Sequence, residues 1–159
     1  MTAFLYLASQ SPRRRQLLDQ LGVRHELLLA APDEDAEALE EHIAGETPAV
    51  YCERVTQLKL DAAVARMQRR GLAPAPVLCA DTTVALGRRI FGKPADADDA
   101  VATLTRLSGQ THRVMTAVGS INTGVIAKEM QTGLEEHEKR MNGIHACSRR
   151  RTMSAFEVK

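Results

Sequence analysis

The feature that most constrains the fold is an alternation of short apolar runs with longer stretches whose apolar residues recur at helical spacing. Residues 4–8 form one apolar run and residues 77–80 form another, each short enough for a buried strand. Helical patterns follow both runs, an order typical of sheets flanked by helices rather than of bundles or sandwiches. The sequence therefore predicts an α/β fold with a mixed sheet flanked by helices.

The remaining elements follow from turn and cap residues. Thr47 and Pro48 are expected to open the longest helix, which Gly71 ends, and Asp96 is expected to cap a further helix ended by Gly109. Extended segments are predicted over residues 26–31, 82–86, 90–91 and 111–118, with a turn at residues 87–88.

Each predicted helix has an apolar stripe that we expect to face the core. The expected stripes are Leu17, Leu18 and Leu21 in the first helix, Tyr51, Val55, Leu58, Ala62 and Ala65 in the longest, and Val101, Leu104 and Leu107 in the next.

Composition excludes several classes of protein. The chain has 159 residues, about one domain, and a formal net charge of +1, so nothing indicates a nucleic-acid partner. No apolar run is long enough to span a bilayer and no secretory leader is visible, so we expect a cytoplasmic protein without a membrane partner. The cysteines 52, 79 and 147 form no Cys-x-x-Cys pair, and we expect Cys52 and Cys79 to be reduced core residues.

The first strand-to-helix junction combines several groups that attract anions. Ser11 stands at the N-cap position, Pro12 suits the first turn, and Arg13 and Arg14 follow. Free helix N–H groups, the helix dipole and guanidinium groups all favour phosphate oxygens. A capped surface helix with solvated arginines has the same pattern, so both interpretations remain open at this point.

Asp81 is the strongest candidate for a reacting group because it follows the buried run at residues 77–80. A partly desolvated carboxylate there can take a proton from water or hold a divalent cation, although a turn or cap aspartate is the commoner case. Other charged residues in the sequence favour a role for Asp81 in chemistry. Lys59, Lys93 and the arginines supply cations for phosphates, and the acidic segment around Glu34 supplies further carboxylates.

Four motifs in order resemble those of the Maf family. They are Leu-Ala-Ser-Gln-Ser-Pro-Arg-Arg at residues 7–14, Cys-Ala-Asp-Thr-Thr-Val at 79–84, Gly-Lys-Pro at 92–94 and Leu-Ser-Gly-Gln-Thr-His-Arg-Val at 107–114. The resemblance implies a fold like that of the inosine triphosphate pyrophosphatases. It also implies a nucleoside triphosphate pyrophosphatase that uses Mg²⁺ or Mn²⁺, and a possible homodimer.

Site residues are carried over from this resemblance position by position. Asp81 matches the general base and a metal ligand, and Glu34 falls near an acidic position that helps to hold metal. Arg13, where another branch of the family has Trp, favours dTTP and UTP as substrates, and Thr82 also matches a position that sets base preference. The residues matching substrate-binding positions are Ser11, Arg13, Arg14, Lys59, Thr82 and Lys93.

The resemblance stops after Val118, where the family's Gly-Ile-Gln-Gly segment is missing. We therefore expect residues 1–118 to be a partial pyrophosphatase domain whose C-terminal half is incomplete. Residues 119–159 are expected to be a divergent tail, with one helix over residues 125–141 and an unstructured end. The alternative function is a catalytically impaired, nucleotide-binding remnant of the family.

Overall fold

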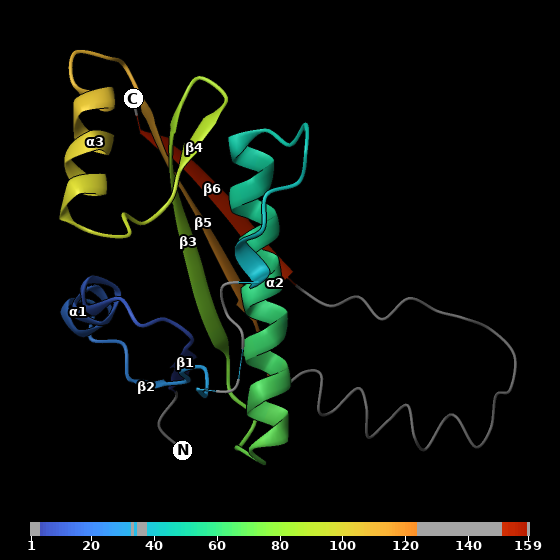
Figure 1. Cartoon of the computed structure of the whole chain (residues 1–159). Coiled ribbons are helices and arrows are strands. Elements are labelled where there is room, and N and C mark those ends of the chain that lie inside the picture. The colour runs from blue at the N-terminus through green and yellow to red at the C-terminus, as the bar shows by residue number, and fades with distance from the viewer. Residues whose placement is uncertain (1–3, 33, 35–37, 124–150, 159) are drawn as a thin grey trace, which may run out of the picture.

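The computed structural model describes residues 4–32, 34, 38–123 and 151–158, and it contains one mixed sheet with helices on both sides (Figure 1). The strands are β1 (Leu5–Leu7), β2 (His25–Leu27), β3 (Val77–Leu86), β4 (Arg89–Phe91), β5 (Arg113–Ile121) and β6 (Arg151–Val158). The helices are α1 (Pro12–Gln20), the 3-10 helix η1 (Ala38–Glu40), α2 (Pro48–Arg69) and α3 (Ala97–Leu107).

The sheet has the strand order β2-β1-β3-β5-β6, and β4 pairs with β3 outside this path. β1 is parallel to β2 and to β3, whereas β3 is antiparallel to β4 and β5. The predicted α/β class and mixed sheet are confirmed.

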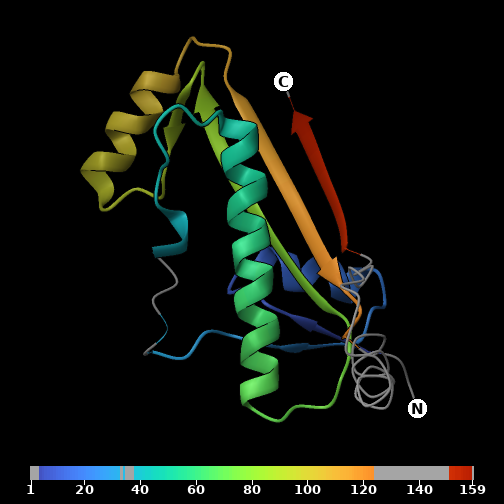
Figure 2. The same ribbon diagram turned by 90° about the vertical axis from the view of Figure 1, so that its right-hand side faces the viewer.

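α2 covers one face of the sheet, where it packs against β3 and β5 (Figure 2). The Thr47 side chain accepts a hydrogen bond from the Val50 N–H, and Gly71 has the positive φ of 59° that ends many helices. Both predicted boundaries are therefore confirmed.

The face of α2 that is buried against the core is rotated by about one residue position from the predicted apolar stripe. Val55 is buried as expected, but Leu58 is 37% exposed, and Leu60 takes the core position instead. Cys52 and Cys79 are buried as expected, and burial raises the pKa of the Cys79 thiol to about 12. The buried positions of α2 are Pro48, Tyr51, Cys52, Val55, Thr56, Leu60, Ala63, Arg66 and Met67.

β3 is one continuous strand of ten residues, so Asp81 lies in its middle and not at its end as the sequence predicted. β5 pairs with β3 from Val77 to Ala85. On the opposite side β1 pairs only with residues 77–78 and β4 only with residues 84–86. Among the described strands, this leaves the β3 edge open beside Asp81.

α1 and α3 lie on the side of the sheet away from α2 (Figure 1). The Asp96 side chain accepts a hydrogen bond of 2.8 Å from the Asp99 N–H, which confirms the predicted cap of α3. The expected burial of both helices is largely wrong. Helical spacing shows which face of a helix is apolar, but it does not show whether another element covers that face. In α1 only Leu18 is buried while Leu17 and Leu21 are 51% and 73% exposed, and in α3 Val101 and Leu104 are 63% and 66% exposed.

β6 pairs antiparallel with β5 from Val114↔Val158 to Ile121↔Arg151. The expected unstructured end is therefore wrong for residues 151–158, because their backbone completes a ladder along β5. The helix expected over residues 125–141 lies outside the described residues, and the domain boundary after Val118 stays a prediction. Within the described residues, no helix is both long and apolar enough to cross a bilayer.

Candidate functional site

A cleft of about 630 Å³ opens at the edge of β3 that β1 and β4 leave free. The β1–α1 loop, the segment after β2, η1, α2, β3 and the loop after β4 all contribute to its walls. The sequence-predicted residues that line it are Ser11, Arg14, Lys59, Asp81, Thr82 and Lys93.

Lys59 joins two carboxylates inside this cleft. Its ammonium donates hydrogen bonds of 2.6 Å to Asp81 Oδ1 and 2.7 Å to Glu40 Oε1. Burial alone would lower the pKa of Lys59, but hydrogen bonds to Asp81 and Glu40 outweigh it and raise that pKa. Burial also opposes ionisation of Glu40, yet the hydrogen bond and charge of Lys59, with the charge of Lys93, lower the pKa of Glu40. The group therefore joins two carboxyl side chains to one ammonium.

The sequence analysis missed Glu40. It precedes Glu41 in an acidic stretch with no motif around it, and only the fold of η1 against α2 brings it to Lys59. Its side chain is 36% exposed, compared with 16% for Asp81. Glu40 therefore presents a partly open carboxylate to the same ammonium that binds Asp81.

The wall formed by α1 has the features expected of an anion site. Ser11 is the N-cap residue, but its side chain makes no cap hydrogen bond, so the first-turn N–H groups have no side-chain partner there. The Arg14 guanidinium donates to Ser9 Oγ at 3.1 Å and to Thr82 Oγ1 at 3.3 Å. Arg14 thus links the start of α1 to β3 at the mouth of the cleft.

Two predicted residues lie outside the cleft lining. Arg13 is exposed on α1. Glu34 accepts hydrogen bonds of 2.8 Å and 2.6 Å from Arg66 and lies 3.2 Å from Arg69. The hydrogen bond from Arg66 is the main reason that the pKa of Glu34 falls to about 2.

The Arg66 side chain is only 8% exposed, and it also donates to the Leu28 carbonyl at 3.0 Å. Glu34 and Arg66 therefore fasten the segment after β2 to α2. A carboxylate surrounded by guanidinium groups is poorly suited to a divalent cation, so the geometry favours an anchoring role for Glu34. Its predicted role in metal binding is not supported by these contacts and stays a prediction.

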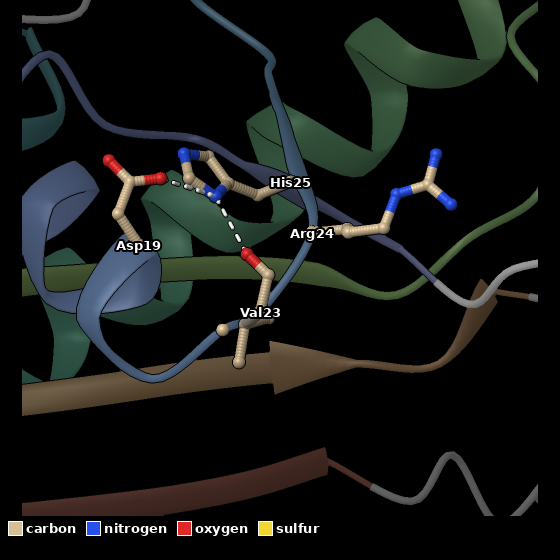
Figure 3. Close-up of a pocket in the computed structure, with 5 residues that line it drawn as sticks. Asp19, Val23, Arg24 and His25 are labelled. Atoms are coloured by element: carbon tan, nitrogen blue, oxygen red, sulfur yellow. Dashed lines mark hydrogen bonds and ion pairs between the residues drawn. The ribbon is translucent and has the colours of Figure 1, made fainter.

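A second hollow, of about 370 Å³, lies at the turn between α1 and β2. Figure 3 shows Asp19 and His25 turned toward each other there, with Arg24 directed away from them. His25 Nδ1 lies 3.0 Å from the Val23 carbonyl and 3.9 Å from Asp19 Oδ1. These contacts stabilise the turn itself. The charged and titratable residues that line the hollow are Asp19, Arg24 and His25, and Arg24 points away from the other two, so they do not form a convergent phosphate-binding set.

The fold and the first cleft define an α/β protein that presents carboxylates, cations and a helix N-terminus to one space. The chain belongs to the Maf-like protein family, whose sequence model matches residues 4–153. A dTTP/UTP pyrophosphatase of Albidiferax ferrireducens is 70% identical over 118 residues, which are 74% of this chain and 59% of that relative. One of Polaromonas sp. is 66% identical over 115 residues, 72% of this chain and 57% of the relative.

The chain therefore spans less than three fifths of the length of these two relatives. A crystal structure of a nucleoside-triphosphatase/dITP/XTP pyrophosphatase from Mycobacterium abscessus matches with a TM-score of 0.44 and 12% identity, over 96% of this chain and 71% of that one.

Proposed function

We propose that this protein is a nucleoside triphosphate pyrophosphatase that converts dTTP or UTP to the monophosphate and pyrophosphate. The observation that carries the proposal is the Glu40–Lys59–Asp81 group in a cleft that Arg14, Lys93 and the start of α1 also line. The relatives named dTTP/UTP pyrophosphatase support the choice of substrate.

In this cleft a divalent cation would take some of its ligands from the protein and the others from the substrate. Within the described residues no cluster of three His, Cys, Asp or Glu side chains is able to hold a metal. Mg²⁺ is commonly bound by one or two carboxylates together with substrate phosphates, and Glu40 and Asp81 provide two carboxylates that share Lys59 as a partner. When bound, Mg²⁺ or Mn²⁺ would neutralise charge on the phosphate oxygens.

Asp81 is the group best placed to take a proton. One of its oxygens is bonded to Lys59, and the other lies 3.5 Å from the Thr83 hydroxyl, a long contact that a water molecule can replace. In the proposed reaction Asp81 accepts a proton from water as the water oxygen bonds to the α-phosphorus. The bond from the α-phosphorus to the bridging oxygen breaks, and pyrophosphate leaves with that electron pair.

Several cations around the cleft are placed to bind different parts of a triphosphate. Lys93 lies near enough to Glu40 to affect its pKa, which places a positive charge beside the carboxylates. Ser11 and Arg14, at the start of α1, line the same cleft. Together these donors are suited to hold a triphosphate in line for attack by water.

The proposal is tested by incubating the protein with dTTP, UTP, CTP, ATP and GTP in the presence of Mg²⁺ or Mn²⁺ and separating the products. Pyrophosphate and monophosphate from dTTP and UTP are expected. Release of orthophosphate would contradict the proposal, and saturable nucleotide binding without turnover would favour the impaired remnant. The homodimer and the cytoplasmic location stay predictions.

A further inference from the structure

Glu40 depends on a segment with little regular structure of its own. Residues 38–47 contain only η1 before α2 begins, so contacts with other elements decide where Glu40 lies. The Tyr51 hydroxyl donates a hydrogen bond of 3.0 Å to the Glu40 carbonyl oxygen. Tyr51 is 6% exposed, so this hydrogen bond fixes the backbone of Glu40 to a buried, immobile ring.

Arg54 holds the same segment at two further points. Its guanidinium binds both carboxylate oxygens of Glu46, at 2.7 Å and 2.8 Å, and donates to the Glu41 carbonyl at 2.7 Å. Such forked pairs are geometrically specific, because two parallel hydrogen bonds fix the orientation of both groups. Arg54 therefore constrains both ends of the stretch that follows Glu40.

The two α2 residues also act on each other. The Arg54 guanidinium lies 5.5 Å from the centre of the Tyr51 ring, and the His42 ring stacks on Tyr51 with centroids 4.7 Å apart. The ring of Tyr51 is thus held between a residue of the segment and the arginine that binds the segment.

We propose that Tyr51 and Arg54 are positioning residues that hold residues 38–47 so that the Glu40 carboxylate faces Asp81 across Lys59. The consequence for turnover rests on the proposed function, but the placement of Glu40 does not. Neither side chain lines the cleft, so both act through Glu40.

The test uses Tyr51→Phe, which removes only the hydroxyl, and Arg54→Gln, which removes the forked pair. Arg54→Lys is the conservative variant, and Gln57→Ala is the control because Gln57 lies on α2 but bonds to Asp61 on the exposed side. Amide hydrogen exchange of residues 38–47 is measured first, because it does not require turnover. Metal dependence and kcat for dTTP are then compared.

Tyr51→Phe and Arg54→Gln are expected to speed amide exchange in residues 38–47 about tenfold. Arg54→Lys should give a smaller change, and Gln57→Ala none. Half-maximal turnover should need severalfold more metal, with kcat less affected. Unchanged exchange in both variants would overturn the proposal, whether or not the protein turns over dTTP.

Discussion

Two ion-pair clusters, one centred on Lys59 and the other on Arg66, lie along the same helix, α2. Lys59 and Arg66 are seven residues apart on α2, about two turns, so both project toward the cleft side. Lys59 binds two carboxylates, Glu40 and Asp81, whereas Arg66 shares one carboxylate, Glu34, with Arg69.

The difference shows what makes a carboxylate available for chemistry. Lys59 is hydrogen-bonded to one oxygen of each of two carboxylates, so the other oxygens remain for a cation or a water molecule. Around Arg66 positive charge is in excess, and the hydrogen bonds of Glu34 are taken by guanidinium groups. We therefore expect the first cluster to determine turnover and the second to determine stability.

The largest effect is expected for Asp81→Asn, which keeps the size of the side chain and removes the proton acceptor. Turnover of dTTP should fall by about 10²- to 10⁴-fold, the usual contribution of a general base. Circular dichroism checks that the variant folds, and Asp98→Asn, a change at an exposed carboxylate on α3, serves as the control. Undiminished turnover in folded Asp81→Asn would remove Asp81 from the mechanism.

Glu34→Gln should act on stability rather than on chemistry. Arg66 is buried and would lose its ionic partner, at a cost of about 3 kcal/mol in the free energy of unfolding. Urea denaturation measures this loss, and kcat of the folded variant should stay within about twofold of the unchanged protein. A large fall in kcat without loss of stability would instead place Glu34 in the reaction.

The pH dependence of that stability has a definite sign. The pKa of Glu34 in the folded protein is about 2, below the ordinary value of 4.5, so its stabilising effect is complete above pH 4.5 and is lost as the pH falls toward 2. The stability difference between Glu34→Gln and the unchanged protein should therefore shrink over this range. A difference that stays constant down to pH 2 would show that the charge of Glu34 is not responsible.

Glu40→Gln should affect metal dependence rather than stability, the reverse of what is expected for Glu34→Gln. Because Glu40 is partly exposed, its loss should change the free energy of unfolding by less than about 1 kcal/mol. The metal concentration for half-maximal turnover should rise about tenfold, since one of two carboxylates is lost. Unchanged metal dependence would limit the metal role to Asp81.

The smallest effect separates two cations that the sequence places together as phosphate ligands. Lys93 lines the cleft and Arg13 does not, so Lys93→Ala should raise KM for dTTP severalfold while Arg13→Ala changes it by less than about twofold. Steady-state kinetics with both variants measures this difference. Equal increases would mean that Arg13 reaches the nucleotide from outside the cleft.

Local chemistry explains which features the sequence predicts well. Thr47 with Pro48, and Asp96, mark helix starts because their effects need only the next few residues. The motifs also contain five of the six predicted residues that line the cleft, and the family resemblance adds Lys59. Glu40 escapes such analysis because its partner Lys59 is 19 residues away and the two meet only when residues 38–47 fold onto α2.

Sheet pairing explains the other main difference. Asp81 resembles a residue at the end of a strand because the apolar run stops before it, yet β5 continues to pair beyond it and extends β3 to Leu86. The open edge arises because β1 ends its pairing at residue 78 and β4 begins at residue 84. Neither limit is encoded near Asp81 itself.

The roles assigned to the two clusters are tested most directly by measuring Mn²⁺ binding. Electron paramagnetic resonance monitors the binding in the presence of a non-hydrolysable dTTP analogue. The unchanged protein, Glu40→Gln and Glu34→Gln are compared at a pH where all three are folded. We expect Glu40→Gln to bind Mn²⁺ about tenfold more weakly and Glu34→Gln to bind it like the unchanged protein. Loss of binding in folded Glu34→Gln, with full binding in Glu40→Gln, would contradict the account.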